Sequence, residues 1–94
     1  MIQSYRDQRT ERFAQGEFVK ALSGIETQAA KRLAILNAAP SLDVLRALPS
    51  NRLEALKGDR AGQWSIRVND QWRICFEWLD GQAGPGAVEI VDYH

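Results

Sequence analysis

Two arginines, Arg67 and Arg73, have the side-chain chemistry to bind a phosphodiester and the spacing to do so together. Both fall on the polar side of a predicted β-hairpin. A guanidinium group makes paired hydrogen bonds to phosphate and keeps its charge at physiological pH. The pattern alone also allows a purely structural role, in which each arginine pairs across strands with Glu77 or another carboxylate. Without further residues that point to a phosphate, the structural role is favoured.

Asp92, Tyr93 and His94 form a second group of side chains that could do chemistry. His94 is the single histidine of the chain, and histidine is the usual side chain for proton transfer near neutral pH. Asp92 could orient the imidazole, and Tyr93 could stack on a base or donate a hydrogen bond. The alternative is a frayed, inert chain end. The preceding strand stays apolar almost to Asp92 and would hold the group in place.

The charged segment 52–60 leads into the hairpin and offers further cations. Lys57 and Arg60 could hold a backbone phosphate, with Gly58 allowing a tight turn between them; the alternative is a solvated loop. Cys75 has no second Cys or His with metal-ligand spacing, and we interpret it as a packing residue. The sequence has no phosphate-binding glycine loop, dinucleotide motif or zinc ligand set, so no cofactor and no metal site are expected.

The two arginines must be positioned by the hairpin, whose register follows from the alternation of its residues. Apolar residues occupy every second position on both sides of 69–71: Trp64, Ile66, Val68, Trp72, Ile74, Phe76 and Trp78. A two-residue loop at 69–70 would set Arg67 opposite Trp72 and mix the faces. A three-residue loop, 69–71, sets Val68 opposite Trp72 and so aligns the apolar faces. That loop also brings Arg67 and Arg73 together on the other face.

The remaining elements are predicted from helical periodicity and capping residues. A helix is expected over 25–38, because apolar residues recur at helical spacing, with Ser23 and Glu26 at capping-box spacing before it. Thr10 could cap a short helix that ends at Gly16, and Ser41 one more turn through Leu45. A first strand is possible over 1–5, and 87–91 is a last strand. One possible strand, helices, and then a three- or four-stranded sheet predict an α+β fold.

Length, composition and charge narrow the class of protein. The 94 residues suit a single domain, 1–94, and 45% are hydrophobic, as in a globular protein. No signal peptide or membrane span is apparent, and one cysteine suits a reducing environment, so a cytoplasmic location is expected. Twelve cations balance twelve anions, which argues against a general nucleic-acid binder. Between Arg46 and Arg73, however, six cations face three anions, and a local basic patch is possible.

The charged segment, the hairpin and the chain end together make the sequence recognisable. Their order and spacing closely resemble the HigB-type toxins of the RelE superfamily, and the likeness covers essentially the whole chain. It is carried by Asn51-Arg52-Leu53-Glu54-Ala55-Leu56-Lys57-Gly58-Asp59-Arg60, Gly62-Gln63-Trp64-Ser65-Ile66-Arg67-Val68-Asn69, Gln71-Trp72-Arg73-Ile74-Cys75-Phe76 and Val88-Glu89-Ile90-Val91-Asp92-Tyr93-His94.

The resemblance implies a compact RelE-like α+β fold, with a curved, mainly antiparallel sheet of three to five strands packed against two or three helices. It also implies a metal-independent endoribonuclease that cuts mRNA in the ribosomal A site. The implied partners are the ribosome, mRNA, a HigA-like helix-turn-helix antitoxin and, only through the antitoxin complex, operator DNA. The roles implied by the resemblance are catalytic for Arg73, Asp92, Tyr93 and His94, and RNA- or ribosome-binding for Lys57, Arg60 and Arg67.

One position departs from the family pattern, and two other functions stay open. Some relatives have histidine where this chain has Glu54, so a glutamate there could act as the base, or that role is absent. The superfamily also includes toxins that poison DNA gyrase, although Arg73 and the Asp92 to His94 ending argue against that reading. A non-catalytic antitoxin-binding co-repressor is the other alternative, and the chain shows no DNA-reading motif in its favour.

Overall fold

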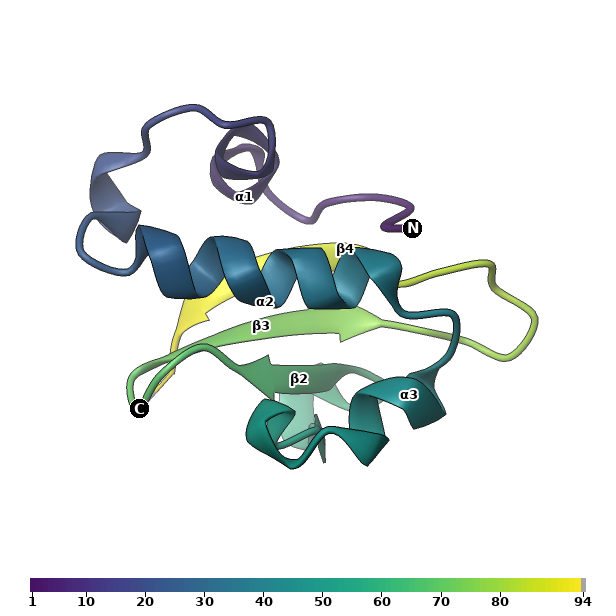
Figure 1. The fold of residues 1–94 in the computed structure, drawn as a ribbon. Helices are drawn as coiled ribbons and strands as arrows, with labels where there is room; N and C mark the ends of the chain where they lie inside the picture. Colours follow the sequence, from purple (N-terminus) through teal and green to yellow (C-terminus); the bar gives the residue numbers. More distant parts are fainter. Residues whose placement is uncertain (94) are drawn as a thin grey trace.

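The computed structural model describes residues 1–93, which form three α-helices and a four-stranded antiparallel sheet (Figure 1). The helices are α1 (Gln8–Ala14), α2 (Glu26–Ala38) and α3 (Leu42–Ala47), and the 3₁₀ turns are Lys20–Leu22, Pro49–Asn51 and Gly58–Arg60. The strands are β1 (Glu54–Ala55), β2 (Trp64–Arg67), β3 (Trp72–Glu77) and β4 (Gly86–Asp92), in the order β1-β2-β3-β4. The α+β prediction is confirmed.

The register of the β2–β3 hairpin is the one that the alternation predicts. Ile66 pairs with Ile74 and Arg67 pairs with Arg73, with residues 69–71 in the connection. The Val68 amide donates to the Trp72 carbonyl at 2.9 Å, which closes the hairpin. The side chains of the two arginines therefore project from the same face of the sheet, next to each other.

The opposite face of the sheet carries the hydrophobic core. Helix α2 lies across it (Figure 1), and its buried Leu33 and Leu36 belong to the same cluster as Ile74 and Phe76. Helix α2 covers Glu26–Ala38, one residue shorter than predicted. Alternation along the strands thus separates an apolar face under α2 from a face that carries the arginines.

The outer edge of β4 is covered by the N-terminal segment, which prevents it from being an open strand edge. Tyr5 forms a parallel bridge to Val88, so the possible strand over 1–5 is reduced to a single bridged residue. In α1, the buried Thr10 hydroxyl accepts a hydrogen bond from the Ile90 amide at 3.0 Å, and Arg9 donates to the Ile90 carbonyl at 2.7 Å.

Two predicted helix caps are wrong. Helix α1 is capped by Asp7, whose carboxylate accepts from the Thr10 amide, so Thr10 is free to bond to β4 instead. The predicted capping box at α2 does not form, because Ser23 ends the preceding 3₁₀ turn and the Glu26 carboxylate accepts from the Gly24 amide. The cap at Ser41 is confirmed, although α3 continues to Ala47 rather than ending at Leu45. None of the helices in residues 1–93 is long and apolar enough to cross a membrane.

Candidate active site

Arg73 is held by two side-chain hydrogen bonds on the face of the sheet that carries Arg67 and Arg73, called here the arginine-bearing face. Its Nε donates to the Ser65 hydroxyl at 2.7 Å, and its Nη2 donates to the Arg52 carbonyl at 2.7 Å. The residue is only 9% exposed. Its Nη1 lies 3.9 Å from Glu54 Oε1, which is an ion-pair distance rather than a hydrogen bond. The protein therefore fixes one part of the guanidinium group and leaves Nη1 near an exposed carboxylate.

The Arg52 carbonyl reaches Arg73 because the backbone there adopts an unusual conformation. Arg52 has φ 46° and ψ 53°, in the left-handed region that non-glycine residues seldom adopt. The preceding Asn51 is fully buried and anchors the turn, since its Nδ2 donates to the Leu45 carbonyl and its Oδ1 accepts from Arg32 of α2. A buried amide and a left-handed residue thus aim one carbonyl at the guanidinium group.

The chain end approaches Arg73 through the β2–β3 turn. The Tyr93 amide donates to the Gln71 carbonyl at 2.6 Å, and the Tyr93 ring centroid lies 5.8 Å from the Arg73 guanidinium carbon. In Figure 1 the end of β4 runs beside this turn.

Asp92 pairs opposite Trp72, and its Oδ2 accepts from the Gln71 amide side chain at 3.0 Å. Alternation along β4 therefore directs Asp92 and Tyr93 to opposite faces, and Tyr93 is the one beside Arg73. The third predicted member of this group, His94, lies outside the described residues.

The three predicted RNA-binding cations have different surroundings. Lys57 is exposed at the start of the 3₁₀ turn Gly58–Arg60. The Arg60 guanidinium donates to Gln63 and to Glu89, each at 3.1 Å, and Glu89 is largely buried. Arg67 is paired with Asp70 of the hairpin turn. Arg60 and Arg67 therefore each have a carboxylate partner, and Glu89 is shared between Arg60 and Arg6. The carboxylates that pair with Arg67 and Arg73 are Asp70 and Glu54 rather than Glu77, which was one of the partners that the pattern allowed.

Several residues around Arg73 were not identified from the sequence. Strand β1 lies within the charged segment 52–60, for which the sequence predicts no strand, and it pairs Glu54 with Ser65 of β2, which brings that carboxylate to the site. Ser65 could have been identified from the sequence, because the alternation places it on the face of Arg67 and Arg73. Glu89 could have been identified in the same way from the alternation along β4. Arg6, 3.7 Å from Glu89, could not, because its position depends on the bridge between Tyr5 and Val88.

Cys75 lies deep beneath this face and is fully buried, in agreement with the interpretation as a packing residue. Burial raises the pKa of its thiol, and the nearby Arg60 only partly opposes that effect. A raised pKa lowers the thiolate fraction at any given pH, and the thiolate is the reactive form. Among the described residues, no group of three or more His, Cys, Asp and Glu side chains is arranged to hold a metal ion.

We expect the Cys75 thiol to react with a disulfide reagent at least about 10²-fold more slowly in the folded protein than in denaturant at pH 8, since access requires local opening. The measurement is the colour released by the reagent over time, with and without guanidinium chloride. Equal rates in the two solutions would show that Cys75 is accessible and that this part of the sheet opens readily.

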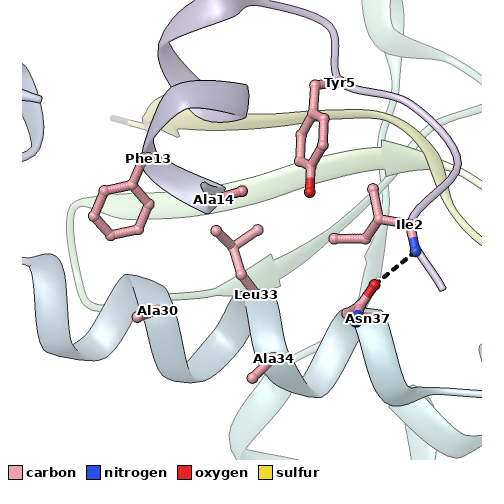
Figure 2. A pocket seen from close by; sticks show the side chains of 8 residues that line it. All are labelled: Ile2, Tyr5, Phe13, Ala14, Ala30, Leu33, Ala34 and Asn37. Carbon is pink, nitrogen blue, oxygen red and sulfur yellow. Dashed lines mark hydrogen bonds between the residues drawn. The ribbon is translucent and has the colours of Figure 1, made fainter. Parts of the chain in front are cut away.

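An apolar pocket of about 260 Å³ lies away from these residues, between the N-terminal segment, α1 and α2. Its lining consists of Ile2, Tyr5, Phe13, Ala14, Ala30, Leu33, Ala34 and Asn37 (Figure 2). Asn37 Oδ1 accepts from the Ile2 amide at 2.9 Å, and burial raises the pKa of Tyr5. None of the predicted site residues lines this pocket, so the candidate site is the open face around Arg73.

Comparisons with known proteins agree with the resemblance seen in the sequence. The chain is 40% identical over 85 residues to Toxin HigB-1 of Vibrio cholerae, which covers 88% of this chain and 90% of the relative. It is 46% identical over 43 residues to Endoribonuclease HigB of Proteus vulgaris, about 46% of this chain and 45% of the relative. A YoeB/ParE toxin structure from Agrobacterium tumefaciens matches 98% of both chains with a TM-score of 0.52 and 16% identity, and supports the fold.

The family model that matches the sequence extends over residues 3–94 and describes the RelE-like toxin HigB of type II toxin-antitoxin systems. This match covers the whole arginine-bearing face, both strands of the hairpin and the chain end. The chain therefore belongs to the HigB-like family of RelE-like toxins from type II toxin-antitoxin systems.

Proposed function

We propose that this toxin is an endoribonuclease that cuts mRNA in the ribosomal A site and thereby inhibits translation. One observation carries the proposal: the Arg73 guanidinium group is held at Nε and Nη2, while its Nη1 lies 3.9 Å from Glu54 Oε1 and its carbon lies 5.8 Å from the Tyr93 ring centroid. A fixed cation of this kind suits a phosphate that gains negative charge during reaction. The name of the Proteus vulgaris relative, Endoribonuclease HigB, supports the same reaction class.

The proposed reaction uses the 2′-hydroxyl of the RNA as the nucleophile. A base removes its proton, the 2′-oxygen bonds to the adjacent phosphorus, and the bond to the 5′-oxygen breaks, leaving a 2′,3′-cyclic phosphate and a protonated 5′-hydroxyl. The RNA supplies its own nucleophile, so the mechanism needs no metal-bound water, and we propose a metal-independent enzyme. Positioned proton transfer of this kind contributes about 10²–10⁴-fold.

Position relative to Arg73 supports roles for Glu54 and Tyr93, while the family resemblance supports roles for Asp92 and His94. Arg73 would stabilise the charged phosphorane, and the exposed Glu54 carboxylate is the base candidate because its Oε1 lies 3.9 Å from Nη1. Tyr93 would stack on a base of the RNA. Asp92 and His94 would act at the chain end, with His94 donating the proton to the leaving oxygen. RNA or the ribosome would be bound by Lys57, Arg60 and Arg67.

The antitoxin is the second part of the proposal. A toxin of a type II system has an antitoxin partner. We propose a HigA-like helix-turn-helix protein, with operator DNA bound only through the complex of the two. We propose that the toxin itself is a single-domain, cytoplasmic protein.

Expression without antitoxin tests the function against its two alternatives. We expect incorporation of labelled methionine to fall within minutes of induction, while incorporation of labelled thymidine continues, because translation is the target. The Arg73→Lys variant, expressed at the same level, is the control for toxicity that does not depend on the site. Loss of thymidine incorporation first would indicate gyrase as the target, and undisturbed growth would indicate a non-catalytic co-repressor.

A further inference from the structure

We propose that Ser65 is a positioning residue for cleavage, which sets the orientation of the Arg73 guanidinium group without touching the RNA. This inference rests on the proposed function. Ser65 is fully buried in β2, and its hydroxyl accepts the Nε hydrogen bond of Arg73 at 2.7 Å. A hydrogen bond from a charged donor is shorter and stronger than one between neutral groups.

Two acceptors are enough to fix a planar group. The Ser65 hydroxyl holds Nε and the Arg52 carbonyl holds Nη2, so rotation about the last side-chain bonds of Arg73 would break at least one hydrogen bond. The guanidinium group has five N–H donors in a fixed plane. Holding Nε and Nη2 therefore determines where Nη1 points, and Nη1 lies on the side of Glu54.

The two acceptors differ in how mutation can test them. The Arg52 acceptor is a backbone carbonyl, which no side-chain substitution removes. The Ser65 acceptor is a single oxygen on a short side chain, and Ser65→Ala removes it with almost no change in volume. The buried Nε would then lack its acceptor, which costs stability and frees the group to turn. Ser65 is thus the position at which the orientation of Arg73 can be changed while its charge is kept.

The experiment measures single-turnover cleavage of one mRNA on programmed ribosomes as a function of toxin concentration. For Ser65→Ala we expect the maximal rate to fall by about 10-fold or more, since small misplacements of a catalytic group have large effects on rate. The toxin concentration at half-maximal rate should stay unchanged, because Ser65 does not touch the ribosome. Ser65→Thr keeps the hydroxyl and should restore most of the rate.

Two controls separate positioning from general loss of stability. Ser41→Ala removes the N-cap hydroxyl of α3, which accepts from the Val44 amide. It should lower the midpoint temperature of unfolding without changing the maximal rate. The second control is the Arg73 Nε–H resonance in ¹⁵N spectra, which should shift in Ser65→Ala and keep its position in Ser41→Ala. Ser65→Cys, with a weak acceptor of similar size, serves if the alanine variant does not fold.

A double-mutant comparison distinguishes failure of this inference from failure of the proposed function. In an Arg73→Lys background, Ser65→Ala should change the rate by less than about two-fold, because the effects of two residues acting through one group do not add. A full additional loss in that background, or a parental rate for Ser65→Ala alone, would overturn the positioning role while leaving the nuclease in place. Full activity of Arg73→Lys itself would overturn the proposed role of Arg73, and this inference with it, whereas absence of cleavage by the parent toxin would overturn the proposed function.

Discussion

Replacing Arg73 by lysine should lower the maximal rate of mRNA cleavage by about 10²-fold or more, in line with the loss of one preorganised donor to a transition state. Lysine keeps the positive charge but has a single ammonium group, which cannot reach the Ser65 hydroxyl, the Arg52 carbonyl and a phosphate with the geometry of a planar fork. In the folded toxin both of these acceptors are engaged by Arg73 at 2.7 Å. The substitution therefore removes the orientation of the charge rather than the charge itself.

The control for this substitution is Arg12→Lys. Arg12 lies in α1 and pairs with Glu17 at 3.5 Å, with about half of its side chain exposed. Exposed ion pairs contribute about 0–1 kcal/mol to stability, so this variant should match the parent in rate and in antitoxin binding. Antitoxin binding should also survive in Arg73→Lys, measured by co-purification. An Arg73→Lys toxin that cleaves as fast as the parent would reduce Arg73 to a structural cation.

The hairpin was predictable from the sequence because parity alone determines its register. Only a three-residue connection places Val68 opposite Trp72 and keeps the apolar residues of both strands on one face, and the structure has that connection. The same reasoning placed Arg67 beside Arg73. Helix α2 was predictable for a similar reason, since a thirteen-residue helix repeats its apolar period often enough to be recognised.

The caps of α1 and α2 and the strand β1 were not predictable, because their partners are distant or ambiguous. The side chain that caps α1 is Asp7 rather than Thr10, since Thr10 bonds to Ile90, eighty residues away. Strand β1 has two residues, too few for any alternation to show. Its position next to β2 is what carries Glu54 to the site, so the base candidate could be named from the resemblance but not located.

The difference between the surroundings of the two arginines also could not be predicted from the sequence. Arg67 has the structural partner that local sequence allows, the carboxylate of Asp70 three residues on. Arg73 is different, because its hydrogen bonds go to neutral acceptors, a hydroxyl and a carbonyl. Neutral acceptors fix a guanidinium group without neutralising it. The carboxylate near Arg73 is the exposed Glu54, 3.9 Å from Nη1, and we propose that a phosphate binds on this side of the guanidinium group. Sequence alternation alone could not indicate this arrangement.

The charges around the site lead to a second prediction with a large expected effect. We expect mRNA to be cleaved at least about 10²-fold faster on programmed ribosomes than free in solution, because the ribosome orients the RNA in the site. The net charge is zero, and Arg60 and Arg67 are paired with Glu89 and Asp70. Affinity for a bare strand depends on phosphates neutralised by free cations and falls steeply with salt.

The measurement compares one transcript with and without ribosomes at physiological salt, and the matched control is the same transcript lacking its ribosome-binding site. That control RNA should be cleaved slowly even when ribosomes are present, because it does not enter the decoding site. Lowering the salt should raise cleavage of free RNA more than cleavage on the ribosome, since only the former relies on screened surface charges. Equal rates for free and ribosome-bound RNA would contradict ribosome dependence and leave a free-standing nuclease. In that case the ion pair between Arg60 and Glu89 would have to open as RNA binds, and Glu89→Gln should then accelerate cleavage of free RNA.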